Sequence, residues 1–322
     1  YKDEDAHREK PFFAFLNLME AHLPFYPPKE YLEKVNPDIA KNPNARKVMQ
    51  QWNNEAYRWS CPLPEGLTDF EDEVLNTYYD AEVAFQDAFL DKLLKKIAER
   101  SKDRETLTII VGDHGDGIGE HNYFGHAFVA YQELIHVPLI MHWPQKIEAS
   151  QRVAGPVSTR RIFHTILSAA QVTDQKITTS SATEIAALSL KEVTQGRDVE
   201  NETVYSEVYP PFNFIKAIAD RQPDIVDQFR LNQMRRAIVQ ADTKLIQVDD
   251  APDEMFNLKQ DILEIDSILE KDSKLSKTLN QQLNRMVGTL ESQRDNLIAG
   301  VPLELEQDPQ LLEHLRGLGY ID

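Results

Sequence analysis

Two aspartates, three histidines, a glutamate and five glycines fall within the sixteen residues VGDHGDGIGEHNYFGH (111–126). Carboxylates and imidazoles bind divalent cations, and glycine lets the backbone fold closely around such a centre. The adjacent pair Asp113 and His114 is the sharpest candidate, because both side chains can turn toward one cation. The pair does not select between Ca²⁺, Mg²⁺, Mn²⁺ and Zn²⁺. A polar turn with an aspartate cap is the alternative interpretation.

The segments around this stretch must position it. Three short apolar runs predict buried strands: PFFAFLNLM (11–19), TLTIIV (106–111) and VPLIMHW (137–143). A capping box, TDFE (68–71), begins a helical pattern that continues to about Arg100, and RRIFHTILSAAQV (160–172) predicts another helix. Residues 36–66 are irregular in composition and predict a long connection.

Strands and helices alternate over residues 1–175, which predicts an α/β domain: part of a mainly parallel sheet flanked by helices. Asp113 would then lie at the carboxyl edge of the sheet, where open parallel sheets bind their ligands. Residues 176–322 differ and predict a smaller C-terminal α+β subdomain with an antiparallel sheet. Its expected elements are strands in TVYSEVY (203–209), RRAIVQADT (235–243) and KLIQVDD (244–250), the last two joined by a turn, and a long helix over 261–298.

Composition excludes several classes of function. The net charge of −18 argues against nucleic acid or an anionic membrane as the partner. No run approaches the roughly 20 apolar residues of a membrane-spanning helix. A single cysteine, Cys61, excludes an internal disulfide framework. The compartment stays open.

The stretch 111–126 resembles the S-D-H-G…G-E-H-G signature of the sulfatase family, within the alkaline-phosphatase superfamily. Several further segments resemble the family in the same order: PFFAFLNLMEAHLPFYPP (11–28), YYDAEVAFQDAFLDKLL (78–94), YQELIHVPLIMHWP (131–144), STRRIFHTILSAAQV (158–172), KLIQVDDAPDEMFNL (244–258) and LRGLGYI (315–321). The resemblance implies a metal-dependent sulfuric ester hydrolase that acts on a small-molecule sulfate or phosphate ester.

Roles carry over from the family only where residues match. The resemblance implies that Asp113 and His114 are metal ligands for one divalent ion, with Ca²⁺ preferred over Mn²⁺, Mg²⁺ or Zn²⁺. It implies that His22 contacts the substrate oxyanion and assists the leaving group. The family has a lysine where this chain has His126, so an imidazole would face the transferred group here. A phosphodiesterase or phosphonate monoester hydrolase is therefore the alternative function.

The family's nucleophile motif, C/S-x-P-x-R, has no counterpart in these 322 residues. In sulfatases its Cys or Ser is oxidised to formylglycine. Cys61 fails the pattern, because Leu63 and Glu65 stand where the motif has Pro and Arg. We therefore expect the chain to represent the C-terminal half of the sulfatase fold, inactive alone and prone to self-association. A non-catalytic sulfatase remnant is the remaining alternative.

Overall fold

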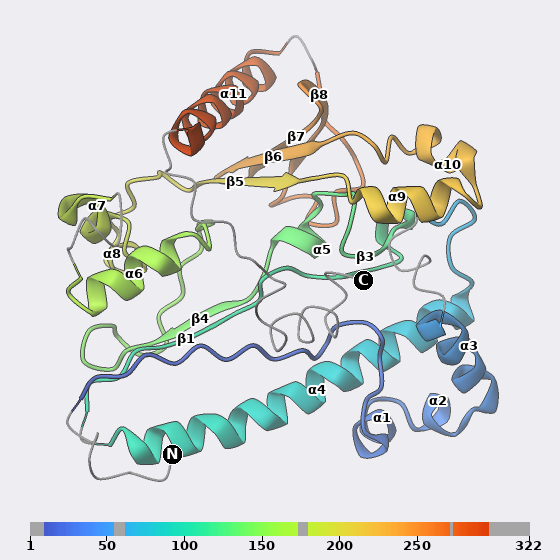
Figure 1. Ribbon diagram of the computed structural model, residues 1–322, viewed down its shortest axis with the longest axis horizontal. Coiled ribbons are helices and arrows are strands. Elements are labelled where there is room, and N and C mark those ends of the chain that lie inside the picture. Colours follow the sequence, from blue (N-terminus) through green and yellow to red (C-terminus); the bar gives the residue numbers. More distant parts are fainter. Residues whose placement is uncertain (1–9, 55–61, 103, 173–179, 271–272, 296–322) are drawn as a thin grey trace, which may run out of the picture. The chain divides into compact units, whose positions relative to one another are not determined.

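A computed structural model of the chain describes residues 10–54, 62–102, 104–172, 180–270 and 273–295 (Figure 1). The chain divides into two compact units, residues 1–276 and 277–322. The predicted domain boundary at residue 175 lies outside the described residues and stays a prediction, and Cys61 and the tail 315–321 also lie outside them.

Helices and strands alternate irregularly along the chain (Figure 1). The helices are α1 (Lys29–Val35), α2 (Pro37–Lys41), α3 (Pro43–Asn54), α4 (Asp69–Arg100), α5 (Gln132–Ile135), α6 (Arg161–Ala169), α7 (Ala182–Ala187), α8 (Leu190–Thr194), α9 (Phe212–Ala219), α10 (Pro223–Gln228) and α11 (Lys274–Asp295). The strands are β1 (Thr108–Val111), β2 (Gly117–Ile118), β3 (Phe124–Gly125), β4 (Leu139–His142), β5 (Thr203–Val208), β6 (Arg235–Gln240), β7 (Thr243–Val248) and β8 (Ala251–Asn257).

The strands that the structure describes pair only in antiparallel fashion. They form a β1–β4 ribbon, a β2–β3 hairpin and a four-stranded sheet in the order β5-β6-β7-β8. The mixed α/β class is confirmed, whereas the predicted parallel sheet is not. Parallel pairing needs a crossover that brings the chain back in the same direction. The chain between β1 and β4 instead turns back, so that Val111 faces Leu139.

The predicted buried strand over residues 11–19 is wrong. No strand is assigned there, and Phe12, Phe13 and Phe15 are 71%, 71% and 81% exposed. A continuous apolar run is typical of a strand that neighbours cover on both faces. Among the described residues no strand pairs with this segment, so its backbone lacks a ladder and its side chains lack cover.

Helix α4 confirms the helix predicted from the capping box. The Thr68 hydroxyl accepts the Glu71 backbone N–H, and the Glu71 carboxylate accepts the Thr68 N–H in return. Acidic residues in the first turn also complement the helix dipole. Leu75 and Tyr78 bury one face of the helix, and α4 contacts α1, α3 and β2.

The long irregular connection predicted over residues 36–66 is also wrong in its first part, which folds into α2 and α3. The Asn36 side chain caps α2 by accepting two backbone N–H groups, and Pro37 occupies the first helical position, where proline is tolerated. Met49 and Trp52 of α3 are buried with Leu75 and Phe124 in one core cluster. Tertiary burial explains these helices better than local propensity does.

The C-terminal strands match the prediction. β6 and β7 pair across a tight turn, with Gln240 facing Thr243, and β8 follows β7 as a second hairpin. The last helix, α11, begins at Lys274 rather than near 261. Glu264 has a φ of +55°, which a right-handed helix excludes, and the Asp261 carboxylate accepts the N–H groups of Ile265 and Asp266.

Candidate functional site

Asp113 and His114 follow β1 directly. The N–H of Gly112 donates to the carbonyl of Pro138, at 3.1 Å, and so extends the β1–β4 pairing by one residue. The chain then leaves the ribbon, and the Asp113 side chain is 87% exposed. Nδ1 of His114 lies 2.8 Å from the carbonyl oxygen of Gly115. Because a carbonyl only accepts hydrogen bonds, Nδ1 carries a proton, and in the neutral ring the lone pair is on Nε2.

The β2–β3 hairpin carries His126 back to the start of the signature stretch. Its register pairs Gly117 with Gly125 and Ile118 with Phe124, and the last two side chains are buried. Continuing the same register places Asp116 opposite His126. Oδ1 of Asp116 lies 3.1 Å from Nδ1 of His126, and the Asp116 side chain is only 6% exposed.

His22 belongs to a loop that side chains of two helices hold. Leu23 and Phe25 are buried, and the Phe25 backbone forms two hydrogen bonds with the Asn53 side chain of α3, at 3.1 and 2.9 Å. The N–H of Tyr26 donates to the Glu82 carboxylate of α4, at 2.6 Å. Nδ1 of His22 faces the carbonyl oxygen of Leu23. The loop therefore presents Nε2 of His22 outward.

Three imidazoles from these three segments meet. The rings of His114 and His126 are stacked, with centroids 4.5 Å apart, and the ring of His22 lies 4.9 Å from His126 and 6.3 Å from His114. The structure thus brings together three of the four residues predicted for the site, and the fourth, Asp113, is adjacent to His114 in sequence. Their catalytic and metal-binding roles stay predictions.

Asp113 and His114 fit part of a metal site. Oδ2 of Asp113 lies 3.9 Å from Nε2 of His114, and two ligands that are each 2.0–2.6 Å from a cation can be that far apart. Within the described ranges, no group of three or more His, Cys, Asp or Glu side chains could hold a metal ion. The pair alone is an incomplete donor set for Ca²⁺, which takes six to eight oxygen ligands.

His121 joins the signature stretch to the C-terminal sheet. Its ring stacks on Tyr131 at 3.7 Å, and its Nε2 lies 3.7 Å from Oε1 of Glu133. Burial and the Lys244 ammonium lower the pKa of His121, whereas burial raises the pKa of Glu133 to about 7. The Tyr131 hydroxyl donates to Glu254 of β8, at 2.8 Å. These contacts favour a structural role for His121.

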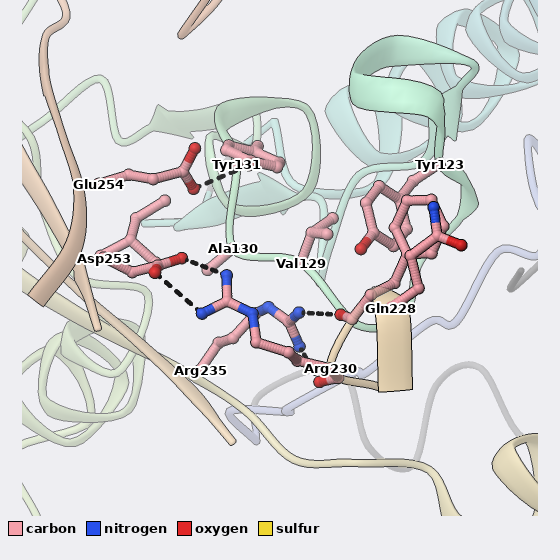
Figure 2. Close-up of a pocket in the computed structure, with 11 residues that line it drawn as sticks. Tyr123, Val129, Ala130, Tyr131, Gln228, Arg230, Arg235, Asp253 and Glu254 are labelled. Atoms are coloured by element: carbon pink, nitrogen blue, oxygen red, sulfur yellow. Dashed lines mark hydrogen bonds and ion pairs between the residues drawn. The ribbon is translucent and has the colours of Figure 1, made fainter. Parts of the chain in front are cut away.

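A pocket of about 190 Å³ lies beside this junction (Figure 2). Figure 2 shows the Arg230 guanidinium forking onto the Asp253 carboxylate, at 2.9 and 2.6 Å. Arg235 donates to the carbonyl of Phe229, at 2.8 Å. None of the three converging histidines lines the pocket. Its charged side chains are two arginines and two carboxylates, so it does not favour an anion.

Sequence reasoning assigned no role to three residues that build the site: Asn53, Glu82 and Asp116. Asp116 stood inside the signature stretch, and its spacing from His126 would have indicated contact had the hairpin been recognised. Asn53 and Glu82 lie far from His22 in the sequence, and only tertiary contact reveals their role.

No described helix is both long and apolar enough to cross a membrane.

Comparison with known families identifies the chain's relatives. The sequence matches the family model described as Sulfatase over residues 2–172, and the one described as N-sulphoglucosamine sulphohydrolase, C-terminal, over residues 119–291. Iduronate 2-sulfatase of Homo sapiens is 27% identical over 150 residues, which cover 42% of this chain and 27% of that protein. An arylsulfatase of Clostridium perfringens is 24% identical over 200 residues, with 59% and 38% covered.

Solved structures with a similar fold include the phosphonate monoester hydrolase SpPMH from Silicibacter pomeroyi. It has a TM-score of 0.58 and 18% identity, with 94% of this chain and 60% of that one covered. A structure in complex with its substrate D-glucosamine-2-N,6-O-disulfate has a TM-score of 0.50 and 21% identity, with 87% and 55% covered. At such identities the likeness shows the fold alone.

The chain spans between about a quarter and two fifths of the length of the two sulfatases named above. The predicted restriction to the C-terminal half is borne out only in part, because the Sulfatase match begins at residue 2. That match extends to residue 172 and so covers more than half of the 322 residues. The chain therefore belongs to the sulfatase family.

Proposed function

We propose that this chain is part of a metal-dependent sulfuric ester hydrolase whose substrate is a small-molecule sulfate ester. The observation that carries the proposal is the convergence of His22, His114 and His126. Each ring directs Nδ1 at an oxygen of its own segment or hairpin, which leaves Nε2 as the nitrogen that can meet a substrate or a cation. Catalytic and ligating imidazoles are held in this manner.

His22 and His126 have distinct roles in the proposal. As the nucleophile bonds to sulfur, the sulfur–oxygen bond of the ester breaks and its electron pair stays on the alcohol oxygen. His22, protonated on both ring nitrogens, gives that oxygen its Nε2 proton and is left neutral with the proton on Nδ1. When protonated, His126 donates a hydrogen bond from Nε2 to the anionic sulfate oxygens. Both roles require the two imidazoles to lie beside the same substrate group, and their ring centroids are 4.9 Å apart.

Asp113 and His114 would hold one divalent cation, Ca²⁺ by preference, through a carboxylate oxygen and Nε2. The cation would supply Lewis-acid stabilisation of negative charge on the ester oxygens. Because two ligands are too few for Ca²⁺, the proposal places the remaining ligands outside the described residues.

The nucleophile is also proposed to come from outside these 322 residues, because they contain no C/S-x-P-x-R motif. The exposed apolar side chains of segment 11–19 support this, since they would be covered by further strands of a complete domain. The isolated chain is therefore expected to bind metal weakly and to turn over no ester.

One observation favours a second function on the same fold. His126 stands where the family has a lysine, so the charge that meets the transferred group depends on an imidazole rather than an ammonium. A phosphodiesterase or phosphonate monoester hydrolase is the alternative that this difference supports, and SpPMH has a similar fold. A non-catalytic remnant is the third hypothesis.

The test compares this chain with the complete protein from which the sequence comes. Calcium binding is measured by calorimetric titration, and turnover is measured with aryl sulfate, aryl phosphate and aryl phosphonate esters. We expect weak binding and no turnover for the chain alone, and aryl sulfate turnover for the complete protein. Asp113→Ala should abolish turnover, because it removes an anionic ligand, and Asp87→Ala on the exposed face of α4 is the matched control.

Each outcome separates the hypotheses. Tight calcium binding and turnover by the 322-residue chain alone would contradict an external nucleophile. Faster turnover of the phosphonate or phosphate ester would favour the alternative hydrolase. Absence of all three activities in the complete protein, folded and calcium-loaded, would favour the remnant.

A further inference from the structure

Asp116 is a buried carboxylate directed at His126. Its side chain is 6% exposed, and its Oδ1 lies 3.1 Å from Nδ1 of that ring. An aspartate is seldom so deeply buried without a partner, because desolvation penalises its charge. In the part of the chain that the structure describes, His126 is the partner that meets this carboxylate at hydrogen-bonding distance. The burial of this carboxylate is therefore explained by its contact with His126.

The register of the β2–β3 hairpin favours this contact. Gly117 faces Gly125 and Ile118 faces Phe124, and extending this register by one residue beyond the strands sets Asp116 against His126. The buried Ile118 and Phe124 side chains anchor the register, because a slip of one residue would turn them out of the core. The pair is consequently determined by the hairpin rather than by a chance meeting of surface side chains.

We propose that Asp116 is a positioning residue: it holds the proton of His126 on Nδ1 and presents Nε2 to the substrate. An ionised carboxylate only accepts hydrogen bonds, so Nδ1 must be the donor in this pair. A carboxylate that fixes the tautomer and direction of a catalytic imidazole is a general device of active sites. The proposal rests on the proposed function for the role of Nε2, but not for the tautomer.

The neighbours of the His126 ring leave only its Nε2 edge for the substrate. His126 stacks on His114 at 4.5 Å between centroids, so one face of its ring is occupied, and its Nδ1 edge is held by Asp116. The Nε2 edge is left to face outward. A lysine at this position could offer three donors in any rotation, whereas the imidazole offers one and must be aimed. The hydrogen bond to Asp116 fixes the direction of the ring.

The test is the tautomer of His126, read by ¹⁵N–¹H correlation spectra of the chain labelled at histidine nitrogens. Spectra are recorded in alkaline buffer, where the imidazoles are neutral. His126→Gln identifies the signals of His126 by their loss. We expect the wild-type ring to carry its proton on Nδ1. A proton on Nε2 of the wild-type ring would overturn the proposal, whatever the activity of the protein.

Asp116→Asn is the informative variant, because its amide can donate to Nδ1 and should shift the proton to Nε2. Asp116→Glu retains the carboxylate and should restore the Nδ1 proton, at least in part. Asp87→Asn on exposed α4 is the control and should leave the spectrum unchanged. An unchanged tautomer in Asp116→Asn would also contradict the proposal. If that variant fails to fold, the wild-type spectrum still decides.

Activity provides an independent readout in the complete protein. Asp116→Asn should lower kcat by about 10- to 100-fold, as removal of an orienting partner generally does, with a smaller change in KM. Asp116→Glu should recover part of the loss. If the complete protein hydrolyses no sulfate ester while the tautomer results hold, the proposed function fails and the positioning role of Asp116 stands.

Discussion

The ammonium nitrogen of Lys244 lies 2.6 Å from a carboxylate oxygen of Glu264, and both side chains are fully buried. The other oxygen of Glu264 accepts the backbone N–H of Gln132, at 2.6 Å. Burial lowers the pKa of Lys244 and raises that of Glu264, and each partner opposes the effect on the other. The pair connects β7 to α5, which follows the signature stretch.

Breaking this ion pair from one side should destabilise the fold strongly. Lys244→Met leaves the Glu264 carboxylate buried without its counter-charge, and we expect a loss of about 3–5 kcal/mol in the free energy of unfolding. The double variant Lys244→Met/Glu264→Gln should lose less than the single variant. Urea denaturation measures both, with exposed Lys259→Met as the control. A loss below about 1 kcal/mol in Lys244→Met would contradict the expectation.

Glu133 should make stability depend on pH. Burial raises its pKa from the ordinary 4.5 to about 7, so the folded chain holds this proton more tightly than the unfolded chain does. The resulting contribution is complete below pH 4.5 and is lost as the pH rises through 7. A shift of this size corresponds to at most about 3 kcal/mol.

Glu133→Gln removes the titration while it keeps the shape of the side chain. The difference in unfolding free energy, wild type minus variant, should therefore decrease between pH 4.5 and pH 7. Denaturant titrations at several pH values measure this difference. A constant difference over the window would show that the pKa of Glu133 is not raised in the folded chain, and an increase would show that it is lowered; either result would contradict the expectation.

Gly115 should tolerate no side chain. A Cβ atom at this position would lie 1.9 Å from the carbonyl oxygen of Glu133, and the Gly115 N–H already donates to the Leu134 carbonyl, at 2.9 Å. Gly115→Ala must push the signature stretch away from α5, and we expect a cost of about 1–3 kcal/mol or more. Gly288→Ala is the control, because nothing lies within 4 Å of its added Cβ. Equal denaturation midpoints for the two variants would contradict this.

The isolated chain should self-associate through segment 11–19. Phe12, Phe13 and Phe15 are each more than two thirds exposed, and adjacent exposed aromatic side chains favour association. Phe12→Ser/Phe15→Ser should reduce the apparent mass in light scattering at high concentration. Phe212→Ser, at a residue 73% exposed elsewhere on the chain, should have less effect. A monomeric wild-type chain over a wide concentration range would refute the expectation.

Local patterns were sufficient for several elements. The capping box Thr68–Glu71 and the helical spacing behind it predicted α4, and the β-branched run before Gly112 predicted β1. The β6–β7 hairpin followed from two strand patterns around a short turn. For α4 and the β6–β7 hairpin the decisive contacts join residues close in the sequence, so the local pattern is sufficient. For β1 the pattern predicted the strand, whereas its partner β4 lies about 30 residues further along the chain.

Other features depend on contacts between distant segments. Segment 11–19 has the composition of a buried strand, but whether a strand forms depends on neighbours that the pattern does not specify. The antiparallel direction of β4 and the late start of α11 were likewise decided by long-range packing and by the conformation of Glu264. The spacing of apolar residues indicates which side chains are buried, but it does not indicate which residues they pack against.

The sequence by itself determined which residue types gather in the signature stretch, and through them the family and the candidates Asp113, His114, His22 and His126. Only the tertiary structure decided that the three ring centroids lie within 6.3 Å of one another and that the Asp116 carboxylate meets Nδ1 of His126. The physical reason is that hydrogen-bond direction depends on hairpin register and on loops held by α3 and α4. The contacts that hold the His22 loop join segments far apart in the chain, and the Asp116–His126 contact depends on a hairpin that the apolar pattern does not indicate.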